Sequence, residues 1–282
     1  MGGRTVELSL ERGVHSHCGG TVRTLLICHE NQRLDSEVMP RWLASFSTLT
    51  RIVSIVDTRE GLMRRTKREL RRVGPARMLD VVAFRMYYAM TLAASDRRWE
   101  DEQIRQLGAR YAPVNGVERL ATRSPNTAAV EAFIREAAPD VIIARCKFLL
   151  KESIFSIARS GTFVIHPGIC PEYRNAHGCF WALAERDCDR VGATLLRIDK
   201  GIDTGPVFGY FRAPIDEVAE SHVRIQARVV YDNLDAIATT LRQVHAGNAA
   251  PLETNGRHSA VWGQPWLTKH LRWKRLARRS RT

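Results

Sequence analysis

The chain has 282 residues, 44% of them hydrophobic, and a formal net charge of +13. This length and composition are typical of one large globular domain or one domain with an appendage, and no apolar run approaches the roughly 20 residues that a membrane-spanning helix needs. Two segments carry the whole charge excess, because residues 59–77 contain eight basic and two acidic side chains and residues 269–281 contain seven basic and no acidic ones.

The amino-terminal part begins with a polar segment and then alternates between strand and helix patterns. Residues 1–22 lack the unbroken apolar core of a signal peptide, so we interpret them as a flexible leader and expect a cytoplasmic protein with reduced cysteines. Residues 24–30 and 51–57 are compact apolar runs, which predict two buried strands. Apolar residues at helical spacing from Val38 to Phe46 predict a helix between them, and this order implies a parallel strand pair.

Residues 59–110 are helical in composition and long for a simple connection, so we predict a helical insertion with a basic first half. The hydrophobic periodicity of the remaining chain predicts the elements that follow. They are a strand near 111–117, a helix over 130–137, a strand over 139–145, a short helix over 153–159, a strand over 161–167, a helix over 178–186, strands over 191–199 and 205–213, and one long amphipathic helix over 223–244.

Strands that alternate with helices predict an α/β fold, with a Rossmann-like, mostly parallel sheet, helices on both faces and a helical C-terminal appendage. We divide the chain into the leader, a main domain over residues 23–215 that contains the insertion, and residues 216–282 with the long helix and a basic tail. In such sheets the functional site lies at the carboxyl ends of the strands. His166 is predicted at one of these ends.

Two motifs within residues 161–211 carry the chemistry. The first runs from His166 to Arg174 (HPGICPEYR), and the second runs from Gly201 to Val207 (GIDTGPV) in the link between two predicted strands. In order and separation they resemble the His-Pro loop and the Asp-x-Gly segment of the folate-dependent formyltransferases, which include methionyl-tRNA, glycinamide ribonucleotide and sugar N-formyltransferases. Residues 139–150 resemble the folate-binding strand and loop of that family.

The resemblance implies transfer of a formyl group from the co-substrate 10-formyltetrahydrofolate to an amine, such as an amino sugar or another small amine. His166 would donate to the developing oxyanion and move a proton, and Asp203 would orient the imidazole and favour its charged form. A packed loop histidine and a turn aspartate are the structural alternatives. The residues expected to contact the co-substrate are Arg145, Cys146, Lys147, Phe148, Leu149, Pro167 and Gly168.

One departure from the family pattern bears on activity. The family has an asparagine two residues before the histidine, as an amide donor to the formyl oxygen, whereas this chain has Val164. Loss of one such donor costs about a hundredfold to a thousandfold in rate in other enzymes. We therefore keep two alternatives, a catalytically impaired relative that acts as a binding or scaffold protein and a formyltetrahydrofolate hydrolase. The side chains that could replace the missing donor are Asn175, His177 and Lys147.

Two rival kinds of site have weaker support. His166, Cys170, His177 and Cys179 include good zinc ligands, but their spacing matches no familiar structural zinc site, so we predict no metal. Residues 28–35 (CHENQRLD) lack the Gly-x-Gly-x-x-Gly turn of a dinucleotide site.

The two basic segments predict an anionic partner, which could be a membrane surface, a phosphorylated substrate or RNA. In residues 59–77 the alternative is a solvated helix face. In residues 269–281 basic residues alternate with Leu and Trp, which is typical of a membrane-surface or partner-binding helix, with a frayed basic tail as the alternative. The 71 residues after Phe211 read mostly as one helix and this tail, which argues against the separate C-terminal barrel domain of the initiator-tRNA formyltransferases and against a tRNA acceptor.

Overall fold

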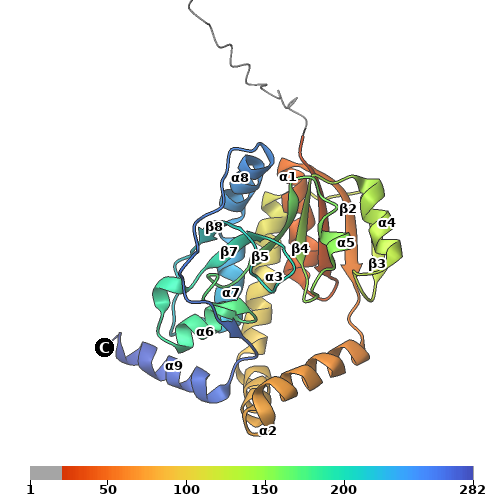
Figure 1. Cartoon of the computed structure of the whole chain (residues 1–282). Coiled ribbons are helices and arrows are strands. Elements are labelled where there is room, and N and C mark those ends of the chain that lie inside the picture. Colours follow the sequence, from red (N-terminus) through yellow and green to blue (C-terminus); the bar gives the residue numbers. More distant parts are fainter. Residues whose placement is uncertain (1–20, 282) are drawn as a thin grey trace, which may run out of the picture.

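The computed structural model describes residues 21–281, except for the side chains of residues 62 and 65, so the predicted leader lies almost wholly outside the described residues. Within this range, seven strands form one sheet in the order β3-β2-β1-β4-β5-β7-β8 (Figure 1). These strands are β1 (Arg23–His29), β2 (Thr48–Ile55), β3 (Glu118–Thr122), β4 (Val141–Arg145), β5 (Gly161–His166), β7 (Ala193–Arg197) and β8 (Val207–Phe211).

The sheet is parallel from β3 to β5, and β7 and β8 are added antiparallel to it and to each other. The predicted α/β class and mostly parallel sheet are therefore confirmed. The carboxyl ends of the five parallel strands meet at one edge, and His166 is the last residue of β5. A second, two-stranded sheet joins β6 (Arg174–Asn175) to β9 (Val261–Trp262), so it ties the segment after β5 to a distant part of the chain.

Helices cover both faces of the main sheet, as predicted. On one face a large apolar core contains residues of α1, α6, α7, α8 and α9, and on the other a smaller core contains residues of α4 and α5. The helices outside the insertion are η1 (a π-helix, Leu34–Val38), α1 (Met39–Phe46), α4 (Ala128–Ala137), α5 (Glu152–Phe155), α6 (Gly178–Ala184), η2 (Cys188–Arg190), α7 (His222–Tyr231), α8 (Leu234–His245) and α9 (Leu267–Arg279).

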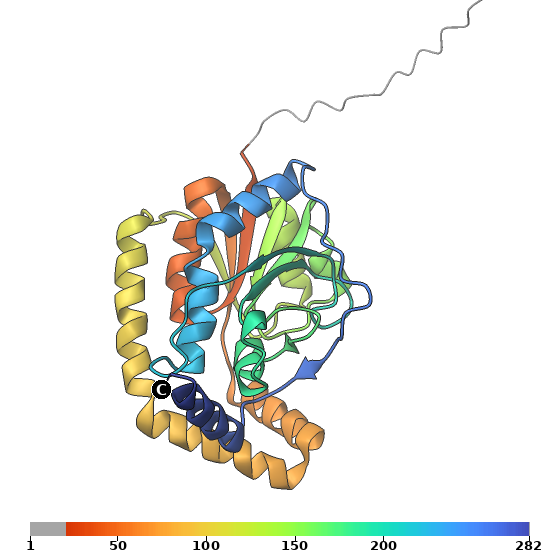
Figure 2. The ribbon, with the colours of Figure 1, turned by 90° about the vertical axis from the view of Figure 1, so that its left-hand side faces the viewer.

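The predicted helical insertion consists of α2 (Arg59–Thr91) and α3 (Ala93–Arg110). Helix α2 is kinked at Gly74, whose φ of 79° is outside the helical range and is readily adopted by glycine, and Pro75 follows. Beyond the kink α2 runs along the rim of the molecule and turns into α3, which rises beside the main domain (Figure 2).

Two predicted elements need correction. The third strand is β3, Glu118–Thr122, and not residues 111–117, because α3 extends to Arg110 and the following residues form a loop with Pro113. The single long helix over 223–244 is two helices, α7 and α8. Between them the Asn233 amide donates to the carbonyl oxygens of Val229 and Arg212, both at 3.0 Å, so the polar side chain stabilises the break.

Most of the carboxyl-terminal segment is the helix α9, so the alternative of a frayed tail is wrong. Trp273 in α9 is 0% exposed, and its indole N–H donates to Glu217 at 2.9 Å. Part of the apolar face of α9 packs against α2 and α6 through Trp273 and Ala277, whereas Leu271 remains 49% exposed. Among residues 21–281, we find no helix with the length and apolar character needed to cross a bilayer.

Candidate active site at the carboxyl edge of the sheet

His166 is buried at the carboxyl end of β5. Its Nε2 lies 2.8 Å from the carbonyl oxygen of Tyr173, and because a carbonyl oxygen can only accept, Nε2 carries a proton and donates this bond. On the other side of the ring, Nδ1 lies 3.6 Å from Oδ2 of Asp203. This distance exceeds a direct hydrogen bond, so the imidazole and the carboxylate are close neighbours without being directly bonded.

Asp203 lies in the link between β7 and β8, with a φ of 51° that Asp and Asn tolerate better than most side chains. Its Oδ2 accepts a 2.7 Å hydrogen bond from the backbone N–H of Asn175. The Arg174 guanidinium donates to the carbonyl oxygen of Ile202 at 3.0 Å. Each of these bonds joins a side chain of one segment to the backbone of the other, and the structure brings the predicted histidine and aspartate together.

A close approach of two glycines shapes the loop after His166. A Cβ atom on Gly168 would lie 2.6 Å from the Tyr173 carbonyl oxygen and 2.8 Å from Nε2 of His166, and one on Gly178 would lie 2.5 Å from Cα of Gly168. A side chain at either position would displace the carbonyl group that fixes the imidazole. Glycine at 168 therefore contributes to the orientation of His166.

The far end of this loop is held by residues that sequence reasoning missed. Arg257 donates two hydrogen bonds to the buried Glu172 carboxylate, at 3.0 and 2.7 Å, and it also contacts the Tyr210 hydroxyl. The Tyr210 hydroxyl in turn donates to the carbonyl oxygen of Cys170 at 2.7 Å. The sequence offered no signal for Arg257, because it lies 85 residues from its partner in a segment without periodicity.

Val164 lies two residues before His166 on β5, so the alternation of a strand places both side chains on the same face. It is partly buried and packs in a small apolar cluster with Cys170, Leu196 and Val207. The position of the family amide is thus filled by a side chain that takes part in packing and cannot donate a hydrogen bond.

The three predicted replacement donors have different surroundings. Asn175 is exposed, and its amide donates to the carbonyl oxygen of Trp262. Burial, together with the charges of Lys147 and Arg85, lowers the pKa of His177 to about 4, so its imidazole is neutral at pH 7. Lys147 is exposed in the loop after β4 and is close enough to His177 to influence its titration.

The predicted co-substrate strand and loop lie beside β5 at the same edge. The Arg145 guanidinium is used internally, because it donates to Asp35 at 2.7 Å and to the carbonyl oxygen of Ile165. By contrast, the side chain of Leu149 in the following loop is 57% exposed. Asn126, a residue that sequence reasoning missed, holds this loop by donating from its amide to the Leu149 carbonyl oxygen at 2.9 Å.

Four further residues that were predicted to contact the co-substrate are Cys146, Phe148, Pro167 and Gly168. Cys146 and Phe148 are partly exposed in the same loop as Leu149, and Phe148 stacks on His29 with ring centroids 6.0 Å apart. Pro167 is partly exposed beside Gly168 at the start of the His-Pro loop. All four therefore lie at the carboxyl edge that carries His166.

The positions of the thiols do not favour the zinc site considered from the sequence. Within residues 21–281, no three His, Cys, Asp or Glu side chains are arranged to hold a metal ion. The Cys179 thiol is fully buried and donates to the Gly192 carbonyl oxygen at 3.4 Å, and burial raises its pKa to about 12. Cys170 is also buried, and burial raises its pKa well above the ordinary value of a thiol.

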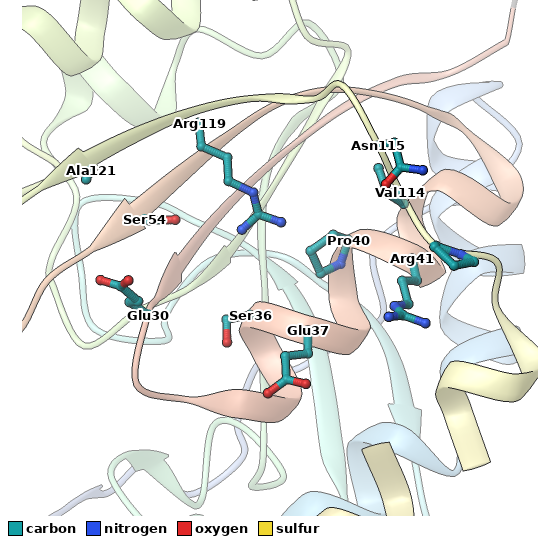
Figure 3. A pocket seen from close by; sticks show the side chains of 11 residues that line it. Glu30, Ser36, Glu37, Pro40, Arg41, Ser54, Val114, Asn115, Arg119 and Ala121 are labelled. Carbon is teal, nitrogen blue, oxygen red and sulfur yellow. The ribbon is translucent and has the colours of Figure 1, made fainter. Parts of the chain in front are cut away.

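A separate groove of about 550 Å³ lies beside the outer strands β2 and β3 (Figure 3). Arg119 extends from β3 toward Pro40 and Ser54, and Glu30 and Glu37 lie at the side. Two basic and two acidic side chains line it, so its charge favours no single class of ligand. None of the predicted site residues lines this groove.

Comparison with known proteins finds relatives that are similar over about half of this chain. Methionyl-tRNA formyltransferase of Sorangium cellulosum is 31% identical over 173 residues, which are 58% of this chain and 52% of that protein. The corresponding enzyme of Corynebacterium diphtheriae is 31% identical over 180 residues, 57% of either chain. The chain therefore spans about half the length of these relatives.

Solved structures of formyltransferases share the fold. Phosphoribosylglycinamide formyltransferase from Anaplasma phagocytophilum has a TM-score of 0.53 at 11% identity, over 87% of this chain and all of that chain. A sugar N-formyltransferase from a Shewanella species has a TM-score of 0.50 at 14% identity, over 86% of this chain and 76% of that chain. The family model described as "Formyl transferase" matches residues 92–241, which is more than half of the chain, and the protein therefore belongs to the formyltransferase family.

Proposed function

We propose that the protein transfers a formyl group from 10-formyltetrahydrofolate to an amine, with an amino sugar or another small amine as the acceptor. The observation that carries the proposal is the 3.6 Å approach of the His166 imidazole to the Asp203 carboxylate at the carboxyl edge of the sheet. We assign the reaction to residues 23–215, with residues 216–282 as a C-terminal segment whose helices α7, α8 and α9 pack on that domain.

In the proposed reaction the acceptor nitrogen bonds to the formyl carbon, and the bond between that carbon and the folate nitrogen breaks. The negative charge that develops on the formyl oxygen needs a hydrogen-bond donor, and the attacking amine must lose a proton. His166, protonated on Nδ1, would donate to the oxygen. Asp203 would accept the amine proton, which then passes by way of His166 to the departing nitrogen.

The surroundings of the pair suit these roles. The bond from Nε2 to the Tyr173 carbonyl oxygen fixes the ring, so that Nδ1 faces Asp203. The exposed Leu149 and the partly exposed Phe148 offer an apolar surface at the same edge, as a flat pteridine ring would require. His177, neutral at pH 7, would be a second hydrogen-bonding group for the substrate.

The test measures release of tetrahydrofolate with a panel of acceptors that includes amino sugars, small amines and methionyl-tRNA. We expect His166→Ala and Asp203→Asn each to reduce kcat by about a hundredfold to ten-thousandfold. Asparagine tolerates the backbone conformation at 203 and can still accept from the Asn175 N–H, so Asp203→Asn should stay folded. His245→Ala, at the opposite edge of the sheet, is the matched control. Full activity of both site variants would refute the assignment.

Val164 supports a second candidate, a catalytically impaired relative that binds folate without rapid transfer. Substituting Val164→Asn separates the two functions. If the site is impaired, the restored amide should raise the rate by about a hundredfold, whereas a fall in existing activity would mean that the pocket is adapted to valine. Titration with a folate analogue tests binding independently of the acceptor, and release of formate without an acceptor would identify a hydrolase.

A further inference from the structure

The second half of α2 exposes an apolar stripe that has no function in the fold. Four side chains at helical spacing point away from the body, with exposed fractions of 42% to 75%: Leu79 (73%), Val82 (42%), Met86 (60%) and Met90 (75%). The opposite side of the same helix carries Val81 and Phe84, which are buried at 0% and 4% exposure. A helix that is apolar on its outer as well as its inner side normally has a partner on both.

The stripe is about 16 Å long, from the 1.5 Å rise per helical residue. The inner side of α2 already contacts α9, where the rings of Phe84 and His270 lie 5.2 Å apart. In both views α2 lies at the rim of the molecule, on the opposite side from α8 (Figures 1 and 2). A flat surface can therefore reach the stripe without collision with the main domain.

The first half of α2 adds a cluster of cations. Four exposed basic side chains line a shallow cleft of about 270 Å³, and none of them forms an ion pair with another described residue: Arg64, Lys67, Arg68 and Arg71. Glu69, on the other side of the helix, accepts from the backbone N–H of Gln264 and so faces the body. The four cations therefore lie on the outward side of the first half of α2, and the apolar stripe lies on the outward side of the second half.

We propose that the outer side of α2 binds an anionic lipid surface. Lipid phosphates would neutralise the four cations, and the stripe would enter the boundary between headgroups and acyl chains. The choice of a lipid surface depends on both the four cations and the apolar stripe. RNA would match the cations but leave the apolar stripe in water, and a second copy of the chain would cover the stripe but leave the cations unneutralised. The helix lies on the surface, since α2 lacks the character of a bilayer-spanning helix.

The test is co-sedimentation of the full chain with vesicles of phosphatidylcholine alone or mixed equally with phosphatidylglycerol. We expect binding to the anionic vesicles and a loss of binding as salt is raised. Removal of the cations should weaken binding by about a hundredfold or more, through the variant Arg64→Gln, Lys67→Gln, Arg68→Gln and Arg71→Gln. Removal of the stripe should weaken it by about tenfold or more, through the variant Leu79→Gln, Met86→Gln and Met90→Gln. All of these positions are exposed, and glutamine is a good helix former.

The first control matches the cation variant in charge, and the second replaces one exposed apolar residue outside α2. The first neutralises four exposed cations of other elements, Arg123, Lys151, Arg159 and Arg242, and the second is Leu252→Gln. Both should bind vesicles as the natural chain does. The proposal is overturned if the anionic vesicles are not bound, if the charge control is as weak as the cation variant, or if the stripe variant binds normally. It is also overturned if light scattering finds a dimer that the stripe variant abolishes, or if RNA competes fully while the stripe has no effect.

Discussion

Replacing His270 by phenylalanine should make the protein more resistant to acid. His270 is 1% exposed, lies between the rings of Phe84 and Trp273, and its Nδ1 has no hydrogen-bond partner among the described residues. Burial, with smaller contributions from the charges of Lys274 and Arg278, lowers its pKa from 6.5 to about 4. The unfolded chain therefore binds a proton at His270 more readily than the folded one between these pH values.

The sign and size of the effect follow from this difference. Because the folded-state pKa is depressed, the stability that depends on a neutral His270 is complete above pH 6.5 and is lost as the pH falls toward 4. With about 1.4 kcal/mol per pKa unit, the full loss is on the order of 3 kcal/mol, of which about 2 kcal/mol has been lost by pH 5. Phenylalanine fills a similar volume and does not titrate, so His270→Phe should escape this loss.

The assay is urea unfolding followed by circular dichroism at pH 7 and pH 5. Between these values the free energy of unfolding of the natural protein should fall by about 2 kcal/mol more than that of His270→Phe. His258→Phe, at an exposed position, is the control and should retain the natural pH dependence. An identical pH dependence in the natural protein and His270→Phe would show that His270 is not held neutral by burial.

Two further substitutions test how the loop after His166 is held. Gly168→Ala places a Cβ 2.6 Å from a backbone oxygen, so it should lower the free energy of unfolding by about 1–3 kcal/mol. Its control is Gly108→Ala in α3, where the new Cβ meets a flexible arginine side chain, so this variant should be neutral or stabilising. Arg257→Met leaves the buried Glu172 without its bidentate partner and should cost about 2 kcal/mol, whereas Arg190→Met, at a half-exposed ion pair, should cost less than about 1 kcal/mol in the same urea assay. Equal losses of stability in a variant and its control would contradict the role of Gly168 or of Arg257 in holding the loop.

The sequence was sufficient to predict four of the five parallel strands from local patterns, whereas the proximity of the two motifs was implied by the resemblance to the formyltransferases. Buried apolar runs predict strands, and the carboxyl ends of parallel strands share one edge, so the place of His166 followed directly. The break at Asn233 could not be predicted, since apolar spacing continues through α7 and α8 and the break depends on a hydrogen bond to the distant Arg212.

The parts that were mispredicted depend on contacts between distant segments. A basic helix with Trp and Leu residues is compatible with a frayed tail or with a packed helix, and burial of Trp273 against α6 excludes the frayed tail. Arg257 and Asn126 stabilise loops at the candidate site from segments that carry no motif. The structure was needed to show that they bind Glu172 and the Leu149 carbonyl oxygen.

In the candidate site, the groups that fix the positions of His166 and Asp203 do not include the side chain at position 164. The Tyr173 carbonyl oxygen orients His166, and the Asn175 N–H holds Asp203, so the backbone of one loop fixes both members of the pair. Val164 makes apolar contacts and no hydrogen bond to either of them. An asparagine at this position should therefore change the stabilisation of the developing charge while the His166–Asp203 distance stays the same, so that a change in rate reports on the missing donor itself.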